Sequence, residues 1–129
     1  KQMSSFYADK EKMLSQMMRA LPKPDQHLIN NRPEIIDIFS EAASEAHRNE
    51  LDGDHWEWQM YVRPWGFALK DIKVKIGLWY GKVDGNVPVG MGQYLAKHIP
   101  NSQLKIVPDG GHFSTINNHI HEIFEFLLV

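Results

Sequence analysis

Apolar positions follow a helical spacing in the first half of the chain and a strand-like alternation in the second half. Over Ser4–Leu21 and again over Pro33–His47 they recur every three to four residues, which is typical of a helix with one apolar face. A shorter, aromatic-rich run, His55–Tyr61, predicts a third helix. The prolines at positions 22 and 24 are expected to stop the first helix, which leaves Asp25–Asn31 as a link. Residues 1–70 therefore predict three helices and no strand.

From residue 74 onward the pattern changes to strand, helix, strand, helix. The expected elements are a strand Val74–Tyr80, a helix Pro88–Ile99, a strand Gln103–Val107 and a helix Asn117–Leu128 that buries Ile120, Ile123, Phe124, Leu127 and Leu128. Leu78 and Tyr80 share one face of the first strand and Trp79 lies on the other, so both faces are expected to be covered. This order predicts two parallel strands joined by a right-handed helical crossover.

Two turns follow the carboxyl ends of these strands, and each carries one chemically active side chain. The first is Gly81-Lys-Val-Asp84 and the second is Gly110-Gly-His112. Either turn alone is a weak signal, since aspartate and glycine are ordinary turn residues. Neighbouring parallel strands, however, end at the same edge of a sheet, where open α/β sheets place their catalytic groups. The sequence therefore predicts that Asp84 and His112 lie face to face.

The ordered set of strand, Asp84, helix, strand and Gly-Gly-His112 resembles the C-terminal part of an α/β-hydrolase over Asp71–Val129. The resemblance implies a Ser-Asp-His triad in which Asp84 orients the imidazole of His112 and stabilises its charged form. His112 would act as general base toward the serine and then as general acid toward the leaving group. In that family, helices ahead of the Asp-bearing strand form a cap. Residues 1–70 are accordingly interpreted as a helical cap-like segment and residues 71–129 as the C-terminal part of the core.

The serine that such a triad requires is missing from the sequence. The family places it in a Gly-x-Ser-x-Gly turn ahead of the acid, and no serine here has glycine two positions before and two positions after it. We therefore interpret the chain as a C-terminal fragment of an α/β-hydrolase, a helical cap segment followed by a parallel β-α-β-α unit, that is inactive alone. The resemblance implies that the intact enzyme hydrolyses an ester or related acyl or C–C bond of a small molecule, with no metal and no organic cofactor.

Composition narrows the remaining function classes. The chain has 129 residues, 43% of them hydrophobic and 23% charged, which is ordinary for one globular domain. A net charge of −2 argues against a nucleic-acid surface, because binding phosphates requires clustered lysine and arginine. No apolar run is long enough for a membrane span. The absence of cysteine and of a signal peptide favours a cytoplasmic protein.

Two strands make a poor sheet by themselves, because an isolated strand pair is marginally stable. We therefore expect a partner, which is a missing N-terminal half, a second chain, or another copy in a homodimer. Two other function classes stay open, a non-catalytic interaction domain derived from the same fold and a metal-dependent hydrolase that uses Asp84 and His112 as ligands. His119 and His121 are poorly placed to share an ion, because positions i and i+2 of a helix point in different directions.

Overall fold

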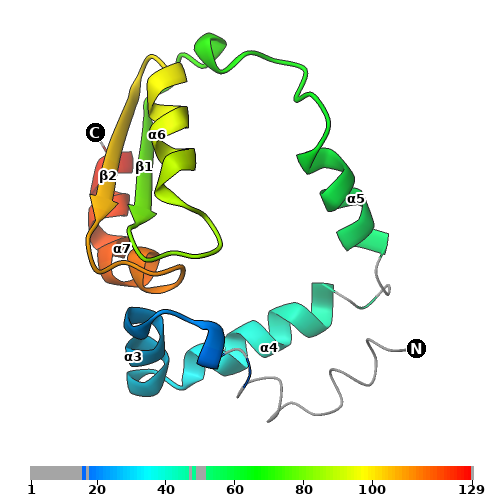
Figure 1. The fold of residues 1–129 in the computed structure, drawn as a ribbon, viewed down its shortest axis with the longest axis vertical. Helices are drawn as coiled ribbons and strands as arrows, with labels where there is room; N and C mark the ends of the chain where they lie inside the picture. Colours follow the sequence, from blue (N-terminus) through cyan, green and yellow to red (C-terminus); the bar gives the residue numbers. More distant parts are fainter. Residues whose placement is uncertain (1–15, 17, 47, 49–51, 129) are drawn as a thin grey trace.

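The computed structural model describes residues 16, 18–46, 48 and 52–128, and it combines helices with a small parallel sheet (Figure 1). The described elements are, in chain order, α3 Lys23–Asn31, α4 Glu34–Ala46, α5 Asp52–Tyr61, the 3₁₀ turn η1 Leu69–Asp71, β1 Ile76–Gly81, α6 Val89–His98, β2 Ser102–Val107 and α7 Ser114–Leu127. The protein is therefore of mixed α/β class. The expected helix Ser4–Leu21 lies almost entirely outside the described residues.

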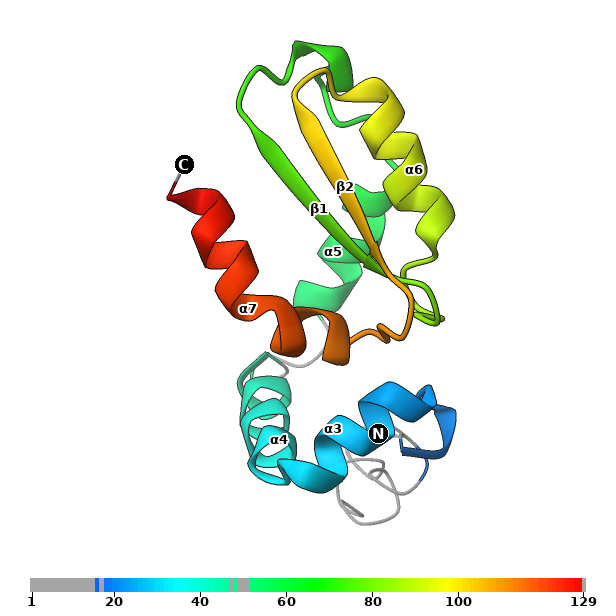
Figure 2. The same ribbon diagram turned by 90° about the vertical axis from the view of Figure 1, so that its left-hand side faces the viewer.

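The sheet consists of β1 and β2, which pair in parallel from Ile76 opposite Ser102 to Gly81 opposite Val107. Helices α6 and α7 flank the two strands (Figure 2). On the α6 side Gly92 lies against the ring of Tyr80. On the α7 side the rings of Trp79 and Phe126 meet edge to face, with their centroids 5.3 Å apart. The predicted parallel crossover and the predicted cover on both faces of the first strand are thus confirmed.

The segment after the paired prolines is a helix, so the link expected over Asp25–Asn31 is wrong. Pro22 is the N-cap of α3 and Pro24 lies in its first turn. Proline is tolerated there because the first N–H groups of a helix have no partner within the helix. The prolines therefore mark the start of this helix as well as the end of the preceding pattern. Helix α3 packs against both α4 and α7.

The expected burial along the last helix is also wrong at its C-terminal end. Phe124, Leu127 and Leu128 are 57%, 69% and 86% exposed. Periodicity located the apolar stripe of α7, but the described elements cover only part of it. The helix also begins one turn earlier than expected, at Ser114, because a side chain from α3 binds its first N–H groups, as described below.

No helix in the described part of the chain combines the length and the apolar character that crossing a membrane requires.

The contact between α6 and the sheet requires a glycine at position 92. A Cβ atom there would lie 2.5 Å from the ring of Tyr80, well inside van der Waals contact. We expect Gly92→Ala to push α6 away from β1 and to lower the free energy of unfolding by about 1–3 kcal/mol. Urea denaturation at a fixed protein concentration measures this change, since any self-association would add to the apparent stability.

Gly90→Ala is the matched control, because Gly90 lies on the same helix with nothing within 4 Å of its would-be Cβ atom. Alanine should stabilise the helix there by up to about 1 kcal/mol. Equal destabilisation by the two substitutions would contradict the contact with Tyr80 as the cause.

Candidate active site

The turns that follow β1 and β2 touch through their main chains. Val83 N donates to the carbonyl oxygen of Gly110 at 3.0 Å, and Lys82 N donates to that of Val107 at 2.9 Å. A Cβ atom on Gly81 would lie 2.3 Å from the same Gly110 oxygen, so the two main chains approach too closely for a side chain. Gly81 and Gly110 are explained by this approach, which brings the following residues of each turn together.

Asp84 and His112, the two residues predicted from the sequence, form a hydrogen-bonded pair. His112 Nδ1 and Asp84 Oδ2 are 3.0 Å apart. An ionised carboxylate can only accept hydrogen bonds, so the network assigns the proton to Nδ1 of His112. Nε2 is then the ring atom with a free lone pair, and none of the described residues bonds it. A base of this kind can take a proton from a hydroxyl that lies within hydrogen-bond distance of Nε2.

The surroundings of Asp84 favour its ionised form. Its side chain is only 8% exposed, and this burial opposes ionisation. Hydrogen bonds from Val87 N at 3.0 Å, from His112 and from Asn86 N at 2.8 Å outweigh the burial, so the pKa of Asp84 is lowered. The carboxylate is therefore both charged and fixed in orientation, which is what holding an imidazole in one tautomer requires.

A hollow of about 290 Å³ opens beside the pair, and it runs along β1. It is lined by the strand residues Gly77, Leu78, Trp79, Tyr80 and Gly81, by Asp84, Val87 and His112, and by Thr115 and Ile116 of α7. No residue of β2 lines it, so the hollow lies at the edge of β1 that faces away from β2. The side chain of His112 is 35% exposed, which leaves the imidazole accessible beside this hollow.

Asp25 is a second acidic residue at this site, and sequence reasoning missed it. Its carboxylate is fully buried and accepts hydrogen bonds from His112 N at 2.7 Å, Phe113 N at 3.3 Å and Ser114 N at 2.8 Å. It thereby caps α7 from another helix, since no side chain of α7 caps its own N-terminus. The available signal was the Pro-Asp pair at positions 24 and 25, which is typical of a first helical turn.

The hydroxyl groups next to His112 in the sequence are both engaged and buried. Ser114 Oγ donates to Asp25 Oδ1 at 2.6 Å and accepts from Gly111 N at 2.8 Å. Thr115 Oγ1 donates to the carbonyl oxygen of Gly111 at 2.6 Å. These hydroxyls hold the loop in shape, and neither is positioned as a nucleophile for His112.

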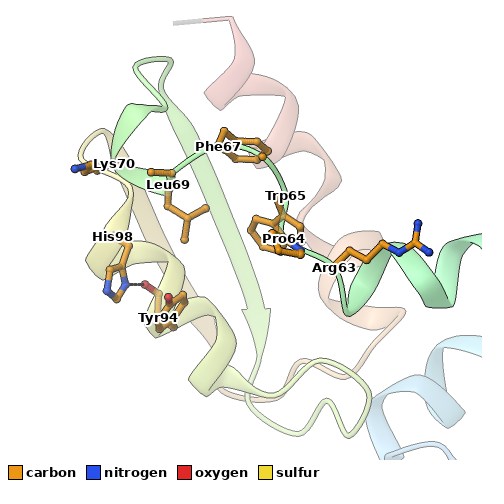
Figure 3. A pocket seen from close by; sticks show the side chains of 10 residues that line it. Arg63, Pro64, Trp65, Phe67, Leu69, Lys70, Tyr94 and His98 are labelled. Carbon is orange, nitrogen blue, oxygen red and sulfur yellow. Dashed lines mark hydrogen bonds between the residues drawn. The ribbon is translucent and has the colours of Figure 1, made fainter.

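A larger open hollow of about 820 Å³ lies elsewhere, between residues 63–70 and α6. Figure 3 shows Trp65, Phe67 and Leu69 on one side of it and Tyr94 and His98 on the other. Two of its polar side chains are turned to local partners: His98 Nδ1 bonds the carbonyl oxygen of Tyr94 at 2.7 Å, and Arg63 bonds Gln59 at 2.8 Å. The smaller hollow beside Asp84 and His112 is therefore the better candidate for chemistry despite its size.

Within the described residues no three histidine or acidic side chains gather as metal ligands would. Glu122 bonds His119 at 3.1 Å and also forms an ion pair with Lys105. The carboxylate beside the two histidines of α7 is thus engaged with a lysine of β2.

Comparisons with protein-family models, with curated proteins and with solved structures found no match to this chain. What the site can do is therefore inferred from its own geometry.

The lowered pKa of Asp84 predicts a pH dependence of stability. The stabilisation from ionised Asp84 is fully present above the pKa of the unfolded chain, near 3.8, and is lost as the pH falls through the lower pKa of the folded protein. Because asparagine does not ionise, we expect the free energy of unfolding of Asp84→Asn to fall less than that of the wild type as the pH is lowered. Urea denaturation at a series of pH values below 5 measures the difference between the variant and the wild type.

Glu122→Gln is the comparison variant, because the hydrogen bond from Lys105 also lowers the pKa of Glu122, at an exposed site away from His112. Its effect should be smaller, since exposed ion pairs contribute little. An Asp84→Asn variant with the same acid dependence as the wild type would contradict the lowered pKa.

Proposed function

We propose that this chain is the C-terminal portion of a serine α/β-hydrolase and supplies the acid, Asp84, and the base, His112, of a Ser-Asp-His triad. The observation that carries the proposal is the bond of 3.0 Å between His112 Nδ1 and the Asp84 carboxylate, at the carboxyl end of parallel strands. In this role Asp84 holds the imidazole and stabilises the imidazolium, while Nε2 of His112 exchanges protons with a serine and a leaving group. The reaction class is hydrolysis of an ester or related acyl or C–C bond in a small molecule.

The serine and the oxyanion-binding groups would come from outside the described residues. The hollow beside the pair supports an approach of the serine from the free edge of β1, because β1 lines the hollow and β2 does not. A further strand added to the free edge of β1 would bring its carboxyl-end turn next to His112 Nε2. We therefore propose that the Ser-bearing half of the sheet joins at β1, either from the same protein or from a second chain. Until it joins, acid and base alone lack most of the machinery for acyl transfer.

A second candidate function is an interaction domain that keeps this fold without catalysis. Large apolar side chains are exposed on α5 and on the segment that connects it to the sheet, with Trp58 of α5 71% exposed and Trp65 and Phe67 of the segment 59% and 58% exposed. Exposed aromatic groups of this kind are typical of surfaces that another protein covers. The hydrolase proposal accounts for them as well, since the missing half would cover part of the same surface.

Measurements of catalytic activity distinguish the hydrolase proposal from the interaction domain. The chain alone should neither hydrolyse a p-nitrophenyl ester nor react with a serine-directed fluorophosphonate probe. When the chain is expressed together with the Ser-bearing half, from the same protein or from a second chain, activity and labelling should appear. In that protein Asp84→Asn and His112→Ala should each lower kcat/KM by about 10³–10⁴-fold, because the imidazole loses its orientation or is absent.

His98→Ala is the matched control, because that histidine lies in the other hollow and, within the described part of the chain, bonds only its own helix. Labelling of the chain by itself would overturn the proposal. Full activity of the Asp84 and His112 variants would favour the interaction domain instead.

The free edge of β1 predicts that the isolated chain associates with itself. Of the large apolar side chains in the described residues, only Leu28, Ile29 and Ile99 are fully buried, which is a small core for a chain of this length. We expect sedimentation equilibrium to give a dimer or larger species at micromolar concentration, and dilution to lower the melting temperature. A stable monomer with a cooperative melt that does not depend on concentration would contradict this prediction.

A further inference from the structure

The main chain of His112 is held by a residue of α3, which is far from it in the sequence. Asp25 Oδ2 accepts the N–H of His112 at 2.7 Å, and Oδ1 accepts the N–H of Ser114 at 2.8 Å and its hydroxyl at 2.6 Å. The carboxylate is completely buried, so water does not share these bonds. No cation pairs with Asp25 among the described residues, and the N–H groups at the start of α7 provide its electrostatic partner.

His112 is therefore fixed at two points that come from different parts of the chain. Asp25 fixes the peptide N–H, and Asp84, in the turn after β1, fixes the ring. A shift of the main chain by about 1 Å would lengthen the bond of 3.0 Å to Asp84 beyond the limit of a hydrogen bond. Errors of this size in a catalytic group are costly, since reacting groups must be held within a few tenths of an ångström.

We infer that Asp25 is a positioning residue that presents His112 to Asp84, and so makes the catalytic pair depend on the cap-like segment. The inference rests on the proposed function, because it concerns the orientation of the same base. It goes beyond that function by assigning a second carboxylate, from residues 1–70, to the geometry of the site. Loss of the Asp25 carboxylate would then change the orientation of the imidazole and not only the stability of the fold.

Glycine at position 111 supports this assignment. A Cβ atom there would lie 2.4 Å from Asp25 Oδ1 and 2.5 Å from the other carboxylate oxygen. The backbone of Gly111 does not have a positive φ, so the glycine is not required for its conformation. The space that it leaves is occupied by the carboxylate of Asp25. One of the two glycines in the Gly-Gly-His motif is therefore explained by the acid from α3.

The experiment measures the tautomer of His112 by ¹H–¹⁵N correlation spectra of the imidazole, on the full 129-residue chain at about pH 8, where histidine is neutral. The wild type should have its proton on Nδ1, as the bond to Asp84 requires. Asp25→Asn replaces one of the two acceptor oxygens with an NH₂ donor, so the N–H groups of His112 and Ser114 can no longer both be bonded. We expect the ring to shift mostly to the Nε2–H tautomer, to the same extent as in Asp84→Asn.

Gly111→Ala is the second variant, since it displaces the carboxylate and leaves Asp25 itself unchanged; it decides the question if Asp25→Asn does not fold. Gly85→Ala is its control, because Gly85 is next to Asp84 and has nothing within 4 Å of its would-be Cβ atom. Leu28→Ala controls for general destabilisation of α3, since Leu28 is a buried apolar residue of that helix. Both controls should keep the Nδ1–H tautomer.

A folded Asp25→Asn or Gly111→Ala variant with the wild-type tautomer would overturn the inference and assign Asp25 to capping of α7 alone. So would a tautomer change in Leu28→Ala as large as that in Asp25→Asn at equal stability. A wild-type ring that is not protonated on Nδ1, or an Asp84→Asn variant without effect, would instead refute the pair on which the proposed function rests.

Discussion

The approach of two main chains at Gly81 and Gly110 determines where the chemistry of this protein can lie. Parallel pairing brings the ends of β1 and β2 to the same edge, with Gly81 opposite Val107. The bond from Val83 N to the Gly110 carbonyl then joins the two turns just ahead of Asp84 and His112. Asp84 follows Gly81 by three residues and His112 follows Gly110 by two, so the two side chains start from neighbouring points. The pair thus follows from backbone geometry, and the glycines are what allow it.

Hydrogen bonds rather than apolar packing give the histidine loop its shape. The loop is enclosed by buried polar groups, of which Asp25, Ser114 and Thr115 are nearly inaccessible. Each bond in such a network is directional, and each unsatisfied partner in the interior would cost free energy. A network of this kind tolerates few alternative arrangements. It is therefore suited to fixing a side chain in one orientation, which a small apolar core alone does less well.

The sequence was sufficient for the parts of the site that depend on local order. Asp84 and His112 could be located because each lies a fixed, short distance after a strand whose alternation is visible. Asp25 could not, because its contact with His112 joins residues 87 positions apart. The prolines before it were compatible with either the end or the start of a helix. Burial at the end of α7 failed for a related reason, since periodicity identifies an apolar face but not the element that covers it.

The contrast between the site and the rest of the surface supports the proposed catalytic role over the second candidate, a role in binding alone. A turn that served only to connect β1 to α6 would have no need of a carboxylate that is 8% exposed and bonded to an imidazole. Burial of such a group opposes its charged form, and the hydrogen bonds from Val87, His112 and Asn86, together with the charge interaction with His112, overcome that effect and lower the pKa of Asp84. The exposed aromatic side chains of α5 and of the segment after it contact one another in pairs, Trp58 with Tyr61 and Trp65 with Phe67. Proton transfer requires a fixed carboxylate beside an accessible imidazole, as at Asp84 and His112. Exposed apolar surface requires only a binding partner that covers it.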